Sequence, residues 1–160
     1  DAITDAIPAW DLSPFNRFPA VAPGTTIAVE ARDTVTLAPE LVRLTMNMAM
    51  THTDASRSVY GKRLVYGGHT IAMAGAQLSR ALPRLVTVLG WFKCDHVAPV
   101  FEEDILYSTV SLDECIATAK GIVGIVKVET RADRGREAPE AGQHIKVLDW
   151  QVAVLLGGTS

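Results

Sequence analysis

The chain has 160 residues, of which 48% are hydrophobic and 21% charged, and its net charge is −3. These values are typical of one globular domain with a sizeable core, and they exclude a disordered chain. They also exclude a basic surface for a phosphate backbone, so we expect no nucleic-acid partner, and no apolar stretch is long enough for a membrane span.

The first 24 residues contain four prolines and show no regular hydrophobic period. We therefore expect a linker or N-terminal extension over residues 1–24 and a single domain over residues 25–160. Because the chain begins at Asp1 rather than methionine, we expect it to be a piece of a longer protein. The two cysteines form no disulfide framework and no signal peptide is evident, which favours a cytoplasmic protein.

A strand is expected first, followed by a helix. Residues 25–36 are rich in β-branched side chains, which favour a strand. Pro39 and Glu40 are typical of a first helical turn, and Leu41, Leu44 and Met48 would form the buried stripe of a helix that ends near residue 50.

Residues 68–82 are apolar on nearly every side, which predicts a helix that is buried all round and ends at Pro83. Four β-rich runs follow, and a charged, turn-rich loop over residues 131–142 should join the last two. The runs cover residues 85–94, 105–115, 122–130 and 145–156. This order predicts an α+β domain in which a curled antiparallel sheet surrounds one buried helix.

The residues that suggest chemistry precede the long helix. Asn47, His52 and Asp54 come first in the chain, and Gly67 and Gly68 then open the helix. The N–H groups at such a helix start can stabilise a carbonyl oxygen that becomes an oxyanion, and a histidine can move the accompanying proton. This combination indicates chemistry on an acyl carbonyl or thioester.

These segments resemble the MaoC-like, R-specific enoyl-CoA hydratases, which have a hot-dog fold. The family motif Asp-x4-His-x-Asp is matched by Asn47, His52 and Asp54, with asparagine in place of the first aspartate. The family's glycine turn is matched by residues 66–68, and its Pro-Val-x-x-Gly-Asp element by residues 99–104. Residues 63–69 and 96–100 are similar to segments of mesaconyl-CoA hydratases, which are double hot-dog proteins.

The resemblance implies reversible hydration of a 2-enoyl thioester with a short or branched acyl chain. His52 would carry the proton, the N–H of Gly67 would hold the thioester oxygen, and Asn47 would hold a water molecule. Substrate contacts would come from a wider set of residues: Asp54, Arg57, Arg63, Tyr66, Gly68 and His69. The substrate would be a thioester of coenzyme A or of an acyl carrier protein, with no further cofactor.

The resemblance also implies a partner, which is a second hot-dog domain in a homodimer or in the same chain. The present chain would then be one half, such as the second half, of a tandem protein. An amide cannot accept a proton, so two alternatives stay open for Asn47. One is a hot-dog acyl-CoA thioesterase, and the other is a catalytically silent half that binds the acyl thioester.

Several of these residues also have structural interpretations. Asp54 is suited to cap a short turn over residues 55–59, and Asn47 to end the preceding helix. Arg57, Lys62 and Arg63 form a basic cluster that is either solvated surface or a contact for the phosphates of coenzyme A. The four histidines have no ligand spacing, so we expect no metal site.

Overall fold

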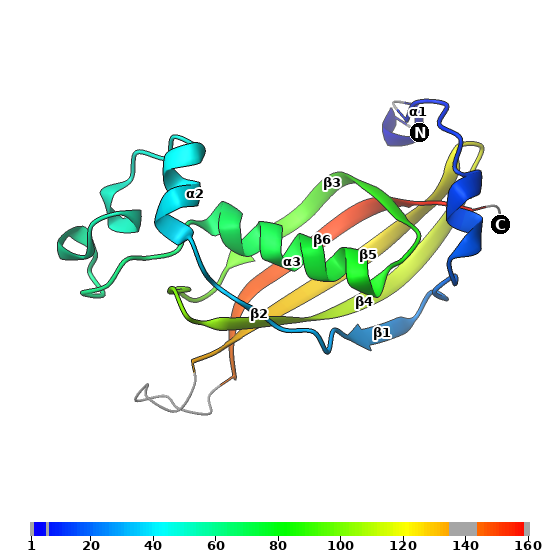
Figure 1. The fold of residues 1–160 in the computed structure, drawn as a ribbon. Helices are drawn as coiled ribbons and strands as arrows, with labels where there is room; N and C mark the ends of the chain where they lie inside the picture. Colours follow the sequence, from blue (N-terminus) through cyan, green and yellow to red (C-terminus); the bar gives the residue numbers. More distant parts are fainter. Residues whose placement is uncertain (1, 6, 135–143, 159–160) are drawn as a thin grey trace.

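The computed structural model describes residues 2–5, 7–134 and 144–158 and shows one antiparallel sheet with a long helix against it (Figure 1). The sheet has six strands in the order β1-β4-β5-β6-β3, and β2 pairs with β4. The strands are β1 (Thr25–Ala28), β2 (Asp33–Thr34), β3 (Leu85–His96), β4 (Ile105–Thr118), β5 (Gly121–Asp133) and β6 (His144–Leu156).

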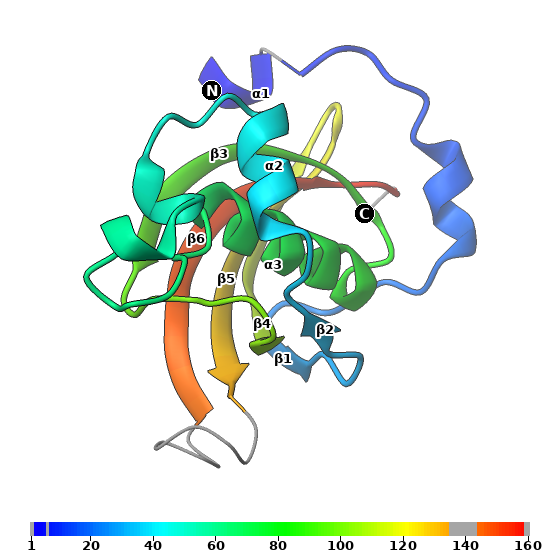
Figure 2. The ribbon, with the colours of Figure 1, turned by 60° about the vertical axis from the view of Figure 1, so that its left-hand side comes forward.

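The sheet curves around α3 (Gly67–Ala81), as Figure 2 shows most clearly. Alternate residues of the four long strands point toward the helix and are buried with it in one core. This core includes Leu78 from α3, Val110 from β4, Val126 from β5 and Val152 from β6, and each is fully buried. The predicted α+β architecture, with a curled antiparallel sheet around one helix, is therefore confirmed.

The helix α3 is buried along one face only, so the prediction that it is buried all round is wrong. Ala74, Gln77, Leu78 and Ala81 face the sheet and are buried, as is Thr70 in the first turn. The opposite face includes Ala72 and Ala76, which are exposed. Small apolar side chains made this face look like core, whereas the single sheet can cover only one side of the helix.

The helix α2 (Ala38–Leu44) begins as predicted, with proline in its first turn, but its predicted buried stripe is wrong. Val42 is buried, whereas Leu44 is 80% exposed and Met48 is 88% exposed. The helix ends six residues earlier than the expected end at residue 50, because Met46 takes a left-handed conformation with φ of 53°. Two short 3-10 turns follow it, η2 (Met50–His52) and η3 (Ala55–Arg57).

The expected first strand over residues 25–36 is divided into β1 and β2, which both pair with β4. Between them the chain bends, and contacts from two other elements hold the bend. Arg32 forms an ion pair with Asp133 at 3.2 Å, and Arg80 donates a hydrogen bond to the carbonyl oxygen of Ala31. These long-range contacts cannot be foreseen from β propensity.

The segment before β1 lies against the end of the sheet (Figure 1). It contains α1 (Ala2–Asp5) and the 3-10 helix η1 (Ser13–Arg17). Ile7 is buried against Val123, Ala153 and Leu155 on the face of the sheet opposite α3. The predicted loop over residues 131–142 begins later than expected, because residues 131–133 belong to β5, and residues 135–142 lie outside the described part.

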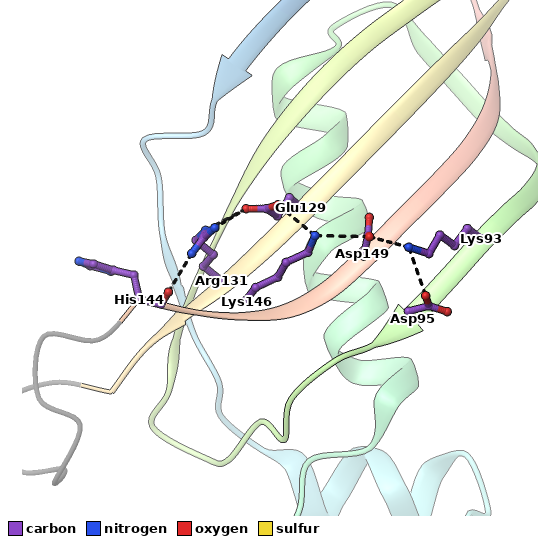
Figure 3. Close-up of polar contacts among 7 residues, drawn as sticks. All are labelled: Lys93, Asp95, Glu129, Arg131, His144, Lys146 and Asp149. Atoms are coloured by element: carbon purple, nitrogen blue, oxygen red, sulfur yellow. Dashed lines mark hydrogen bonds and ion pairs between the residues drawn. The ribbon is translucent and has the colours of Figure 1, made fainter.

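Ion pairs cross the strands on the face of the sheet opposite α3 (Figure 3). Asp149 pairs with Lys93 at 2.7 Å and with Lys146 at 3.3 Å, and Lys146 also pairs with Glu129 at 3.1 Å. Such exposed pairs contribute roughly 0–1 kcal/mol each. No helix of the described residues is long and apolar enough to cross a membrane.

Candidate active site

The first turn of α3 presents two backbone N–H groups that bond to no described residue. Tyr66, which precedes the helix, is extended, and its carbonyl oxygen accepts the N–H groups of His69 at 2.9 Å and Thr70 at 3.4 Å. The N–H groups of Gly67 and Gly68 have no such partner among the described residues. They lie at the positive end of the helix dipole, where a developing negative charge is stabilised.

Both glycines are required by the rings that pack against them. A Cβ atom on Gly67 would lie 2.8 Å from Nε2 of His96, and one on Gly68 would lie 2.5 Å from the ring of Tyr66. Both contacts are too short for a real side chain. The two glycines therefore let aromatic rings come close to the helix start, and any larger residue would displace these rings.

His52 is held in a single orientation by the chain that leads to α3. Its Nδ1 lies 2.7 Å from the carbonyl oxygen of Leu64, and its ring packs edge-on against Tyr66 with 6.0 Å between centroids. A carbonyl oxygen can only accept, so Nδ1 carries the hydrogen. In the neutral ring, Nε2 is therefore unprotonated and can accept a proton, which is what a general base needs.

His52 and Gly67 line one pocket of about 410 Å³ at this end of the helix. Its other walls are mainly apolar and come from the segment before α3, from the first turn of α3, and from the end of β3 with its connection to β4: Tyr60, Leu64, Val65, Thr70, His96, Val97, Ala98, Pro99 and Val100. A mainly apolar pocket with few polar groups is typical of a small-molecule site. Its polar groups are suited to a ligand with a carbonyl group and a short apolar chain.

His96 is a pocket residue to which the sequence analysis gave no role. It is the last residue of β3, and its ring lies against Gly67. Burial lowers its pKa below the ordinary value of 6.5, so the neutral imidazole is favoured. The segment over residues 96–100 is similar to mesaconyl-CoA hydratases, which could have drawn attention to His96. The sequence does not show, however, that β3 ends beside the start of α3.

Asn47 and Asp54 do not line the pocket. Oδ1 of Asn47 accepts the N–H of Ala49 at 3.0 Å, which fixes the turn after α2. Oδ1 of Asp54 accepts the N–H of Ser56 at 2.9 Å and its hydroxyl at 2.7 Å. These bonds to Ser56 lower the pKa of Asp54 and make this residue the N-cap of η3, as its structural interpretation predicted.

The basic cluster lies beside the pocket but is partly neutralised. Arg63 forms an ion pair with Glu102 at 2.7 Å, and Nζ of Lys62 lies 3.9 Å from the centre of the Phe101 ring. Arg57 is exposed at the end of η3.

His69 does not line the pocket. Its Nδ1 is buried without a hydrogen-bond partner among the described residues, and burial lowers its pKa while Glu102 opposes this shift. Within the described ranges no group of three or more potential ligands could hold a metal ion.

Comparison with solved structures places this geometry among hot-dog proteins. The chain matches Rv0216 of Mycobacterium tuberculosis, which has a double hotdog fold, with 41% identity and a TM-score of 0.78 over 91% of the chain and 44% of that protein. It matches a protein of Chloroflexus aurantiacus, named as a MaoC domain dehydratase, with 21% identity and a TM-score of 0.75 over 94% of the chain and 48% of that protein.

A single-domain match is the (R)-hydratase of A. caviae, which is involved in PHA biosynthesis, with 13% identity and a TM-score of 0.64 over 85% of the chain and 97% of that protein. No family model and no curated protein sequence matches the chain. The structural matches confirm the hot-dog fold and the resemblance to MaoC-like proteins. The chain spans about half the length of the two proteins named first.

Proposed function

The chain has a hot-dog fold, and on this premise we propose that it is a MaoC-like domain that catalyses the reversible hydration of a 2-enoyl thioester. One observation carries the proposal. His52, with its Nδ1 bonded and its Nε2 free, lines the same pocket as Gly67, whose N–H group has no backbone partner among the described residues. The (R)-hydratase and MaoC dehydratase names of matched structures support the same class of reaction.

In this proposal the N–H of Gly67 donates a hydrogen bond to the thioester oxygen, with Gly68 beside it. Nε2 of His52 accepts a proton from water as the water oxygen bonds to C3. The electrons of the C2–C3 double bond move toward the thioester oxygen, where the helix start stabilises the enolate. A proton then reaches C2 and completes the 3-hydroxyacyl thioester. The pocket of about 410 Å³ favours a short or branched acyl chain.

The rest of the substrate would extend from the pocket toward the basic cluster. Arg57 and Lys62 are the cluster's cations that form no ion pair with a described residue, and they are suited to a phosphate of coenzyme A or of a carrier-protein arm. Arg63 is engaged in its ion pair with Glu102, so its role would be to stabilise the chain beside the pocket. No further cofactor is needed for this reaction.

Asn47 distinguishes the hydratase from its two alternatives. A thioesterase that positions water with Asn47 and Asp54 is disfavoured, because neither residue lines the pocket and both bond within their own turns. A silent half that binds acyl thioesters is the second candidate, because an asparagine stands where the family has an acid. A second hot-dog domain, from another copy or from the same chain, would pair with this domain both in a hydratase and in a silent half.

The test is the hydration of crotonyl-CoA and mesaconyl-CoA, followed as loss of the enoyl-thioester absorbance. The parent should be active, and His52→Ala should lower its rate by about 10²–10⁴-fold because the proton acceptor is removed. His144→Ala, at the first residue of β6 and outside the pocket lining, is the matched control and should retain the parent rate.

Other outcomes identify the alternatives. Release of free thiol instead of hydration would indicate a thioesterase. Binding without turnover, with activity gained in Asn47→Asp, would indicate a silent half. Full activity in His52→Ala would contradict the proposed role of His52.

A further inference from the structure

The pocket contains a second imidazole on the side of Gly67. His96 comes from the end of β3, whereas His52 comes from η2, so two separate elements bring histidines to one cavity. Apart from these two, Tyr60 is the only titratable residue lining the pocket in the described part of the chain. The neighbouring acid on β3, Asp95, is engaged by Lys93 at 3.2 Å.

The contact between His96 and Gly67 fixes how close this imidazole lies to a bound thioester. Nε2 of His96 is 2.8 Å from the position of a Cβ on Gly67, so it lies next to the Cα of the residue whose N–H would hold the thioester oxygen. C2 is bonded to the carbonyl carbon and lies next to that oxygen. A group beside Gly67 is therefore closer to C2 than to the far end of an acyl chain.

The ring of His96 lies beside the start of α3 without a hydrogen bond within the described part of the chain to hold it there. No side-chain hydrogen bond from this ring to a described residue is present, and the residue is exposed. By contrast, His52 is fixed through Leu64. The absence of a side chain at residue 67 makes room for the His96 ring.

Resting on the proposed hydratase function, we propose that His96 is a second catalytic residue, which transfers the proton at C2 while His52 transfers the proton at C3. In the dehydration direction, His96 takes the proton from C2 and the electrons of that bond move toward the thioester oxygen. The enolate then forms the C2–C3 double bond as the C3–O bond breaks. The leaving hydroxyl takes a proton from the His52 imidazolium and departs as water.

Protons balance across the cycle. His96 gains one proton and His52 loses one, and both return to their starting states by exchange with solvent. Hydration follows the same steps in reverse. The neutral state that burial favours for His96 is the state that a base at C2 requires in the dehydration direction. His96 thereby supplies a proton acceptor that Asn47 cannot provide.

The test uses both enantiomers of 3-hydroxybutyryl-CoA in D₂O, with dehydration and deuterium incorporation at C2 measured together. His96→Gln keeps a polar side chain of similar reach but cannot accept a proton at neutral pH. It should lower kcat by about 10²–10⁴-fold and abolish C2 exchange, and the acid limb of the pH–rate profile should disappear. His52→Ala should lose dehydration but keep C2 exchange. His144→Ala, at a residue that does not line the pocket, is the control.

The outcomes separate this inference from the proposed function. An active parent together with a His96→Gln variant of unchanged kcat, C2 exchange and pH profile would overturn the role of His96 and leave the hydratase standing. A parent that neither hydrates nor dehydrates these thioesters would overturn the proposed function and the inference together. Thermal denaturation of each variant shows whether a lost rate reflects unfolding.

Discussion

At the scale of single residues, the contact between Gly67 and His96 is a tight constraint on the site. A methyl group at residue 67 would lie 2.8 Å from Nε2 of His96. Gly75, in the same helix, provides a contrast, because a Cβ there would meet nothing within 4 Å. The same substitution therefore has different physical consequences at the two positions.

We expect Gly67→Ala to destabilise the fold by about 1–3 kcal/mol through overpacking. Gly75→Ala should instead stabilise it by about 0.5–1 kcal/mol, since alanine is the better helix former. In a His96→Ala background the cost of Gly67→Ala should disappear. Urea denaturation of the single and double variants measures these changes, and an equal cost of Gly67→Ala in both backgrounds would show that His96 is not the obstacle.

Some of the site could be predicted at this scale and some could not. The position of His52 and the glycine turn followed from the motif spacing, and the cap formed by Asp54 followed from local preference. The surroundings of Asn47 did not, because its bond to Ala49 depends on the left-handed turn at Met46. The role that we propose for His96 required knowledge of which strand ends beside α3.

At the scale of elements, the long strands were the most predictable part. Their apolar alternation is strong, and each observed strand includes the predicted run with small extensions at one or both ends. The helices were harder. The sequence around α2 has apolar residues at helical spacing, yet Leu44 and Met48 are exposed because the helix ends early and turns away from the sheet. Periodicity indicates an apolar face but does not indicate what covers it.

At the scale of the whole molecule, α2 and the turns after it extend beyond the end of the sheet (Figure 1). This part carries exposed apolar side chains, which we call the apolar arm: Leu37, Leu44, Met46, Met48, Met50 and Val59. Exposed large apolar side chains gathered in one part of a domain often belong to an interaction site. Rv0216, which the chain matches, has a double hotdog fold, and we expect a second hot-dog domain to cover the apolar arm.

We expect the chain to associate with a second copy through the apolar arm. The double variant Met46→Lys/Met48→Lys should weaken association at least tenfold, because two charges would have to be desolvated. Glu114→Lys, an exposed charge change on β4, is the control and should leave association unchanged. Sedimentation velocity over a range of concentrations measures the effect. A parent that stays monomeric at every concentration would contradict the expectation.

The central claim is that the start of α3 binds a thioester carbonyl through Gly67. The most direct measurement follows the amide resonance of Gly67 in ¹⁵N–¹H spectra as butyryl-CoA is added, since this saturated thioester cannot be hydrated. We expect a saturable downfield shift of the Gly67 amide proton, accompanied by shifts of the His52 and His96 rings. Saturable binding that leaves these three groups unmoved, or no binding at all, would contradict it.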